Sequence, residues 1–330
     1  MNNEHEHIPV SLLLTTRNEA EHISLFLDGV RAQSVRPAEI VVCDGGSTDG
    51  TGKLLQHEAA LRQEESDAPP LRVIVAPGTN IAEGRNHAIR AAAQDILAFT
   101  DAGCELAPDW LERITEPLLR SDDVDAVGGG YDLVGDRAAQ RWARAATLPF
   151  ARQNAEQFLP SSRSFAARRI ALEKAGLYPE HLTFAGEDTA LVLRMKEQGA
   201  RFVTRWDARV RWYPRPTLRA FLRQHYLYGL GDGEAGSNQA RHLRTAVKWS
   251  AFLFLTVLAI AASLLHHYLW LALPPALLIV YGIRLGRIYA WNTYRWRDRL
   301  GGFLCIALKE WSMFAGYVVG RLRGAPGRNA

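Results

Sequence analysis

The stretch Ala98-Phe-Thr-Asp101-Ala-Gly-Cys104 decides the fold, because a short apolar run ends there in a single acidic residue. Residues 96–99 predict a buried strand, and Asp101 lies in the turn that follows it. The same design appears earlier in Ile40-Val-Val-Cys-Asp44-Gly-Gly-Ser-Thr. Strands that end in an aspartate are typical of an open α/β sheet, in which ligands bind beside the carboxyl ends of the strands.

Strands and helices alternate on both sides of this stretch. The apolar pattern predicts strands at residues 8–14, 39–43, 71–76 and 95–100, with helices between them that include 18–32 and 81–93. Such alternation implies a parallel sheet with right-handed crossovers. The pattern then becomes less regular, and it predicts helices at 137–158, 168–175, 188–198 and 218–230. The predicted fold class is therefore α/β.

Composition excludes several classes of protein. The chain has 330 residues, 48% of them hydrophobic, and a net charge of +4. No zinc-ligand spacing or RNA-recognition motif accompanies the basic residues, so we expect no nucleic-acid partner. The cysteines Cys43, Cys104 and Cys305 are distant from one another and predict core thiols in a reducing cytosol. The polar residues 1–7 predict a flexible tail without a cleaved signal peptide.

Four motifs follow one another along the chain. They are Val10-Ser-Leu-Leu-Leu-Thr15-Thr-Arg17-Asn18-Glu19, Asp44-Gly-Gly-Ser-Thr-Asp49, Gly84-Arg85-Asn86 followed by Asp101-Ala-Gly, and Glu187-Asp188. In this order they resemble the family 2 inverting glycosyltransferases of GT-A type. The resemblance implies a Rossmann-like, mostly parallel sheet over residues 8–235, which binds a nucleotide-diphospho-sugar and transfers its sugar with inversion.

The resemblance also implies which residues bind the donor nucleotide. Asp44 matches the acid that contacts the base, and Thr15, Arg17 and Glu19 would form the wall of the same pocket. Arg85 matches a position that contacts the nucleotide. Two structural alternatives stay open, because Glu19 would also stabilise a helix N-terminus and Arg85 would also form a structural ion pair.

Asp101 matches the first acid of the family's Asp-X-Asp element, which implies a nucleotide-sugar contact and a bound Mg²⁺ or Mn²⁺. The third position of that element is Gly103 here, so one carboxylate is missing. Three alternatives follow: Asp101 holds the metal with waters and phosphates, Glu105 assists it, or a basic group replaces the metal's second ligand.

Asp188 is the candidate general base, since a carboxylate at a helix start can take the acceptor's hydroxyl proton during attack from behind the anomeric carbon. Glu187 either orients Asp188 or binds the acceptor. The structural alternative for both acids is an N-terminal cap of the helix predicted at 188–198.

Arg223-Gln-His225-Tyr-Leu-Tyr228 stands where processive synthases carry Gln-X-X-Arg-Trp, and the match fails at its last two positions. A single-addition enzyme is therefore favoured. Arg223 and His225 either contact the acceptor or the diphosphate, or belong to an amphipathic helix on a membrane.

The C-terminal part predicts membrane association. Two uncharged runs within 246–283 predict a transmembrane helical hairpin. Arg and Lys flank the pair but not the loop between its helices, which places the catalytic domain on the cytosolic side of the plasma membrane. Residues 300–323 contain Lys309 and Glu310 and predict an interfacial amphipathic helix.

These features together predict a membrane-anchored enzyme of cell-surface glycan synthesis. It would transfer one sugar to a hydroxyl or phosphate acceptor, and the membrane helices favour a lipid-linked acceptor over a free glycan. Two alternatives stay open. One is a membrane-anchored nucleotidyltransferase, although no glycine-rich phosphate loop follows the first strand. The other is an inactive nucleotide-sugar-binding module, which Gly103 makes conceivable.

Overall fold

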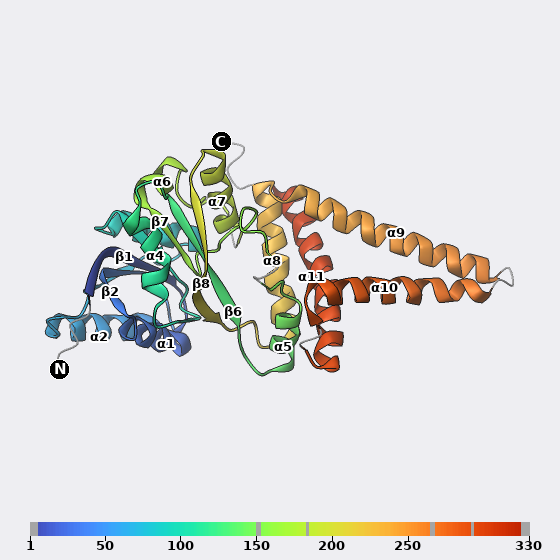
Figure 1. Ribbon diagram of the computed structural model, residues 1–330, viewed down its shortest axis with the longest axis horizontal. Coiled ribbons are helices and arrows are strands. Elements are labelled where there is room, and N and C mark those ends of the chain that lie inside the picture. Colours follow the sequence, from blue (N-terminus) through green and yellow to red (C-terminus); the bar gives the residue numbers. More distant parts are fainter. Residues whose placement is uncertain (1–5, 150–152, 183–184, 265–267, 292–293, 325–330) are drawn as a thin grey trace. The chain divides into compact units, whose positions relative to one another are not determined.

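The computed structural model describes residues 6–149, 153–182, 185–264, 268–291 and 294–324. The chain divides into two compact units, and each is described by itself. The first contains residues 1–133 and 154–213, and the second contains residues 134–153 and 214–330. Figure 1 labels their helices and strands.

The first unit is built on one eight-stranded sheet with the order β3-β2-β1-β4-β7-β6-β8-β5. Strands β3, β2, β1 and β4 are parallel neighbours, whereas β7 is antiparallel to both β4 and β6. The strands are β1 Glu6–Thr16, β2 Val35–Asp44, β3 Leu71–Val75, β4 Ile96–Phe99, β5 Cys104–Leu106, β6 Ala126–Leu133, β7 Phe165–Arg168 and β8 Phe202–Trp212.

The predicted α/β fold is confirmed, with parallel strands in one half and mixed directions in the other. β1 begins at Glu6, inside the predicted tail, because Glu6 and His7 pair with Val35 and Arg36 of β2. Residues 1–5 of that tail lie outside the described residues. The helices of this unit are α1 Ala20–Arg31, α2 Thr51–Glu64, α3 Ile81–Ala91, α4 Trp110–Arg120, α6 Arg169–Lys174 and α7 Glu187–Glu197.

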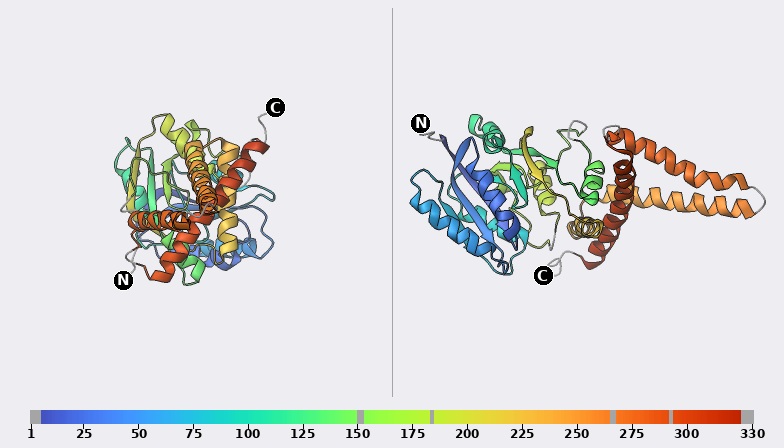
Figure 2. Two further views of the ribbon diagram at one scale, coloured as in Figure 1. Left: turned by 90° about the vertical axis from the view of Figure 1, so that its right-hand side faces the viewer. Right: turned by 90° about the horizontal axis from the view of Figure 1, so that it is seen from below.

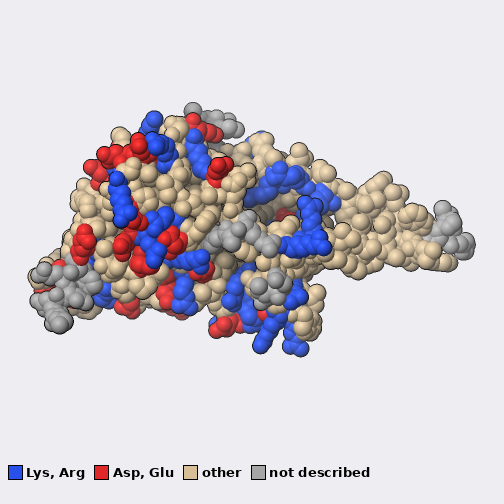
Figure 3. All heavy atoms as spheres, viewed as in Figure 1, with Lys and Arg blue, Asp and Glu red and all other residues tan. Residues whose placement is uncertain are grey.

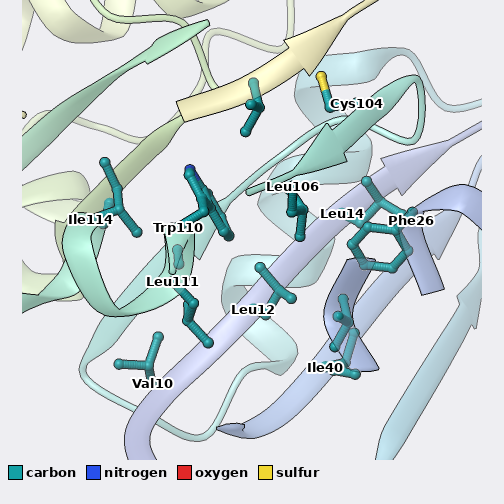
Figure 4. Packing of buried hydrophobic residues seen from close by; sticks show 14 of the residues in the cluster. Val10, Leu12, Leu14, Phe26, Ile40, Cys104, Leu106, Trp110, Leu111 and Ile114 are labelled. Carbon is teal, nitrogen blue, oxygen red and sulfur yellow. The ribbon is translucent and has the colours of Figure 1, made fainter. Parts of the chain in front are cut away.

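The main core of the first unit lies between the sheet and the helices α1, α2 and α4. Figure 4 shows side chains of β1 facing Phe26 of α1, and Trp110 of α4 in the same cluster. Trp110 is fully buried, and its indole N–H donates to the Ser164 hydroxyl at 2.9 Å. Because the indole N–H has this hydrogen-bond partner, burial of the large ring leaves no donor unpaired.

The second unit is helical. Its elements are α5 Ala138–Ala145, α8 Leu218–Ala235, α9 Gln239–Leu264, the 3₁₀ turn η2 Tyr268–Ala272, α10 Leu273–Ile288 and α11 Trp296–Arg323. α5 is shorter than the helix predicted at 137–158, because Pro149 disfavours helical backbone at the residue before it. Residues 150–152 of that prediction lie outside the described residues.

Helices α8 and α11 cross with their backbones in contact at four glycines. A Cβ atom built on Gly229 would lie 1.9 Å from the Met313 carbonyl oxygen, and one on Gly316 would lie 2.0 Å from the Tyr226 carbonyl oxygen. Gly233 and Gly320 make equally close approaches one turn further along. Each helix therefore presents a Gly-X-X-X-Gly face to the other. We name these four residues the glycine crossing.

The glycine crossing explains why α8 is grouped with the C-terminal helices. The sequence prediction placed residues 218–235 in the catalytic domain, whose boundary was set at 235. In the structure the first unit ends at residue 213, and α8 belongs to the second. Hydropathy carries no signal for this division, because α8 is polar enough to read as part of a soluble domain.

Three helices are long and apolar enough to cross a membrane by length and composition: Gln239–Leu264, Tyr268–Ile288 and Trp296–Arg323. α9 and α10 run side by side (Figures 1 and 2) and carry no charged side chain over most of their length, so they appear uniformly tan in Figure 3. Their exposed apolar side chains include Leu253, Phe254, Val257, Ile279 and Val280. Such a surface fits a membrane anchor. The predicted connection at residues 265–267 lies outside the described residues.

The two charges inside α11 have protein partners. Lys309 donates to the Ala146 carbonyl oxygen at 2.6 Å. Glu310 accepts from the indole N–H of Trp249 at 3.0 Å and pairs with the ammonium group of Lys248. In the structure these charges join α11 to α5 and α9, and the interfacial position predicted for residues 300–323 stays a prediction.

Candidate active site

The predicted donor residues lie at the carboxyl ends of adjacent parallel strands. β1 ends at Thr16, which is in register with Asp44 at the end of β2, and Asp101 follows β4 on the other side of β1. Parallel neighbours place their carboxyl ends on one edge, so the strand order itself brings Thr15, Asp44 and Asp101 to one edge of the sheet.

Asp44 is buried and stabilises the turn after β2. One of its oxygens accepts from the Ser47 backbone N–H at 2.9 Å and from the Ser47 hydroxyl at 2.6 Å. Its other oxygen would lie 2.9 Å from a Cβ atom at Gly52, so a larger residue there would displace the carboxylate. The carboxylate is thus oriented before any ligand arrives.

The loop after β1 is held against the loop after β2. Asp49 accepts from the backbone N–H groups of Ala20 and Thr51, which begin α1 and α2. Asp49 thus caps the first backbone N–H groups of these two helices. Glu19 pairs with His22 at 2.8 Å and precedes α1, while Arg17 is exposed beside Gly45.

Helix α3 approaches β1 closely through Gly84. A Cβ atom there would lie 2.3 Å from the Thr15 hydroxyl oxygen, so a larger residue would displace the helix. This approach places the next residue, Arg85, among the acids at the sheet edge. The N-terminus of α3 is closed by a capping box between Asn80 and Glu83.

Arg85 is the centre of the site. Its side chain is only 4% exposed and contacts three carboxylates: Glu187 at 2.7 Å, Asp188 at 2.9 Å and Asp101 at 3.2 Å. Burial alone would lower the pKa of Arg85, but the carboxylates of Asp188, Glu187 and Asp101 raise it well above its ordinary value. The guanidinium therefore stays charged and gathers acids from distant parts of the sequence.

The two adjacent acids of α7 have different surroundings. The Glu187 side chain is 7% exposed and that of Asp188 is 22% exposed. Burial and then the Asp188 carboxylate raise the pKa of Glu187 to about 7, against the opposing effect of Arg85. Glu187 is enclosed, whereas Asp188 retains access from outside.

This raised pKa predicts how stability depends on pH. A glutamate that titrates at about 7 when folded and at 4.5 in its ordinary state binds its proton more tightly in the folded protein. The contribution of this proton binding to the free energy of unfolding is complete below pH 4.5 and is lost as the pH rises through 7. Glu187→Gln should therefore reduce the fall in thermal midpoint between pH 5 and pH 8, measured in detergent. An identical fall in both proteins would contradict this prediction.

Three further residues at the site carry no motif in the sequence. Ser162 donates to Asp188 at 2.6 Å, and the Tyr178 hydroxyl lies 2.6 Å from the Ser162 oxygen. The Arg163 guanidinium lies 4.1 Å from the centre of the Trp212 ring, and its Nε is 3.7 Å from an Asp101 oxygen. No spacing rule identifies these residues, because Ser162 and Arg163 lie in the loop before β7 and Tyr178 follows α6, both without a regular pattern.

The arrangement of the carboxylates at the site shows which of them could hold the predicted metal ion. Among the described residues, no three His, Cys, Asp or Glu side chains gather closely enough to hold a metal ion. Glu105 instead pairs with Arg211 at 2.6 Å and accepts from Tyr213 at 3.2 Å. Asp101 is 31% exposed, and Mg²⁺ is often held by one or two carboxylates together with substrate phosphates. The residues present therefore fit a metal shared between Asp101 and the donor.

The remaining predicted contacts lie in the second unit. Arg223 is exposed on α8, and His225 bonds to the Phe221 carbonyl oxygen of its own helix at 2.8 Å. Burial lowers the pKa of His225 to about 4, so this histidine is neutral at physiological pH. The local geometry of His225 agrees with the structural alternative for this segment. Its relation to the first unit stays a prediction.

The fold and the site define a GT-A-type glycosyltransferase. The chain belongs to glycosyl transferase family 2, whose model matches residues 11–176. A second model, described as glycosyl transferase family group 2, matches residues 100–300. These matches confirm the family expected from the four motifs and set aside the nucleotidyltransferase alternative.

Relatives and a solved structure agree with this family. Glycosyltransferase AglE of Haloferax volcanii is 26% identical over 231 residues, which cover 68% of this chain and 72% of AglE. Succinoglycan biosynthesis protein ExoA of Rhizobium meliloti is 28% identical over 277 residues, which cover 80% of each chain. The mannosyltransferase PcManGT of Pyrobaculum calidifontis, solved with GDP-Man and Mn²⁺, superposes with a TM-score of 0.58 at 18% identity, covering 94% of this chain and 86% of that chain.

Proposed function

We propose that this glycosyltransferase moves one sugar from a nucleotide-diphospho-sugar to a lipid-linked acceptor, with inversion at the anomeric carbon. The observation that carries the proposal is the cluster in which Arg85 holds Asp101, Glu187 and Asp188 at the sheet edge that also bears Asp44. A donor site and a proton acceptor thereby lie within one group of contacts.

Asp188 is the general base of this proposal, and Glu187 is a positioning residue. Asp188 is the more exposed of the two, and Arg85 and Ser162 both donate to it. Glu187 is enclosed and, with its raised pKa, is partly protonated near pH 7. One ionised and one partly protonated acid suit the transfer of a single proton from the acceptor hydroxyl.

The donor would be held by groups that are already oriented. Asp44 accepts from an N–H of the base, and Thr15, Arg17 and Glu19 border the same pocket. Asp101 and the diphosphate would hold a Mg²⁺ or Mn²⁺ ion, which would supply positive charge for the departing phosphates. Metal dependence is typical of the family. Arg85 of α3 donates to one oxygen of Asp101 and so helps to orient this carboxylate.

Membrane anchoring supports a lipid-linked acceptor. Relatives include N-acetylglucosaminyl-diphospho-decaprenol L-rhamnosyltransferase of Mycobacterium tuberculosis and undecaprenyl-phosphate 4-deoxy-4-formamido-L-arabinose transferase of Pectobacterium carotovorum, and both names describe polyprenyl-linked substrates. An enzyme held at the bilayer can reach such a substrate without extracting it. We place this enzyme in cell-surface glycan synthesis at the plasma membrane.

We further propose that the α9–α10 hairpin spans the membrane while α11 lies at its surface. Lys309 of α11 is bonded to the end of α5, and the glycine crossing joins α11 to α8. α8 bears the exposed residues Arg219 and Arg223, whose burial in hydrocarbon would be costly. Arg241, Arg244, Arg284 and Arg287 flank the hairpin and favour a cytosolic catalytic domain.

A donor panel tests the function. Membranes that contain the protein are incubated with radiolabelled UDP-glucose, UDP-galactose, UDP-N-acetylglucosamine, GDP-mannose or dTDP-rhamnose, with and without EDTA. We expect label from one donor in the organic-solvent extract, and loss of this label with EDTA or with Asp101→Ala. Activity that resists EDTA would refute the metal. If no donor of the panel is either transferred or hydrolysed, the result would favour the inactive binding module.

A further inference from the structure

Two buried hydroxyl groups connect to the proposed base. Ser162 lies in the loop before β7, and its hydroxyl donates to Oδ1 of Asp188 at 2.6 Å. Tyr178 follows α6, and its hydroxyl oxygen lies 2.6 Å from that of Ser162. Both residues are only 2% exposed. A series of hydrogen bonds between three side chains therefore leads from the interior of the first unit to Asp188; we name it the hydrogen-bond chain.

The number of protons on each hydroxyl group decides which group donates in each bond of the hydrogen-bond chain. A serine hydroxyl has one proton to donate, and Ser162 directs it to the carboxylate. The Tyr178 hydroxyl must then be the donor in its contact with Ser162. Burial raises the pKa of Tyr178, so its hydroxyl keeps the proton that this role requires. The donation runs from Tyr178 to Ser162 and from Ser162 to Asp188.

The packing around Tyr178 fixes where this chain begins. Asn86 accepts from the Tyr178 backbone N–H at 3.0 Å and donates to its carbonyl oxygen at 2.9 Å. The Arg85 guanidinium lies 5.2 Å from the centre of the Tyr178 ring. Neighbouring residues of α3 thus hold Tyr178 and the acids, so the two ends of the chain are tied to one helix.

The consequence concerns the two oxygens of Asp188. Oδ1 accepts from both Ser162 and Arg85. Within the described residues, the hydrogen bonds to this carboxylate all end on Oδ1, which leaves Oδ2 for an incoming hydroxyl group. A carboxylate without these two donors would rotate about its terminal bond, since such torsions are broad.

We propose that Ser162 and Tyr178 are positioning residues that fix the Asp188 carboxylate with Oδ2 directed at the acceptor. The inference rests on the proposed role of Asp188 as base. It adds two residues to the reaction that no motif identifies, and it assigns different tasks to the two oxygens of one carboxylate.

The test uses Ser162→Ala, Tyr178→Phe and the double variant in the full-length membrane protein, assayed with the panel donor that the wild type uses. Loss of a hydrogen bond to a charged group predicts a fall in kcat of about 10- to 100-fold for Ser162→Ala, with the donor KM unchanged. Tyr178→Phe keeps the ring over Arg85, and its kcat should fall by about 3- to 10-fold. Because Tyr178 acts through Ser162, the double variant should match Ser162→Ala alone.

The pH profile provides a readout that a structural role would not change. The groups that face Asp188 are Arg85 of α3, Glu187 of α7, Ser162 and Tyr178. Ser162 is one of the two donors to Oδ1 of Asp188, so its removal should move the acid limb of the pH profile of kcat. Ser164→Ala is the matched control: Ser164 is equally buried but contacts Trp110 and the Ala208 carbonyl oxygen. It should lower stability without moving the limb.

The outcomes separate this inference from the proposed function. An unmoved acid limb in Ser162→Ala, or additive losses in the double variant, would overturn the inference, provided that Asp188→Asn is inactive. Full activity of Asp188→Asn would instead overturn the role of Asp188 itself. If Ser162→Ala does not fold, Tyr178→Phe still tests the inference, because its expected change in kcat without a change in donor KM needs no alteration of the loop.

Discussion

Replacement of Asp188 by asparagine is expected to lower kcat by about 10²–10⁴-fold while the donor KM stays nearly unchanged. Asparagine keeps the shape of the side chain and its contact with Arg85, but its amide oxygen takes no proton at physiological pH. In the proposed function the donor is bound by groups at the strand ends, so the loss should fall on the chemical step. This pattern distinguishes a general base from a residue that contacts the donor.

The measurement compares initial rates of transfer with donor affinity from thermal shift, since a ligand that binds the folded state raises the midpoint. Asp122→Asn is a suitable control, because Asp122 is fully exposed and only pairs with Arg168 at 3.2 Å. That variant should retain wild-type kcat. Wild-type turnover in Asp188→Asn would remove Asp188 from the reaction and leave Glu187 as the nearest alternative.

Arg85→Met should have the largest effect on stability, about 3–5 kcal/mol, because it leaves the buried Glu187 and the partly buried Asp101 and Asp188 without their shared cation. Methionine approximates the length of the arginine stem, so packing losses are kept small. The variant should also lose transferase activity, since Asp101, Glu187 and Asp188 would no longer be held together. Denaturation of the detergent-solubilised protein provides the stability measurement.

Arg113→Met is the matched control for Arg85→Met. Arg113 also contacts two carboxylates, Asp109 at 2.6 Å and Asp207 at 2.7 Å, but on the surface. Exposed pairs contribute roughly 0–1 kcal/mol, so this variant should be nearly neutral. Equal losses in the two variants would show that burial of the Arg85 cluster has no special energetic role.

The strand-end positions of Asp44 and Asp101 could be predicted from the sequence because they are encoded locally, while their contacts with a donor stay predictions. A strand that ends in an acid is visible within a few residues, and the strand order of a parallel sheet then brings Asp44 and Asp101 to one edge. The family and the apolar helices were predicted for the same reason: motif order and hydropathy are properties of short segments.

The rest of the site depends on contacts between residues far apart in the chain. Arg85 meets Glu187 and Asp188 more than a hundred residues later, and no periodicity records that pairing. Ser162 and Tyr178 are sixteen residues apart, on either side of β7 and α6, and no local pattern records their contact. The membership of α8 was missed because a backbone contact between glycines leaves no hydropathic trace.

The glycine crossing also constrains the order in which the second unit can form. α11 is synthesised after α5, α8 and the hairpin, and domains complete folding as their parts emerge from the ribosome. Until α11 emerges, the glycine face of α8 has no partner, although α9 and α10 are already available for insertion into the bilayer. In the proposed topology, membrane insertion of the hairpin would therefore precede closure of the second unit, and a ribosome that stalls before residue 316 would leave an inserted but open intermediate exposed to cellular quality control.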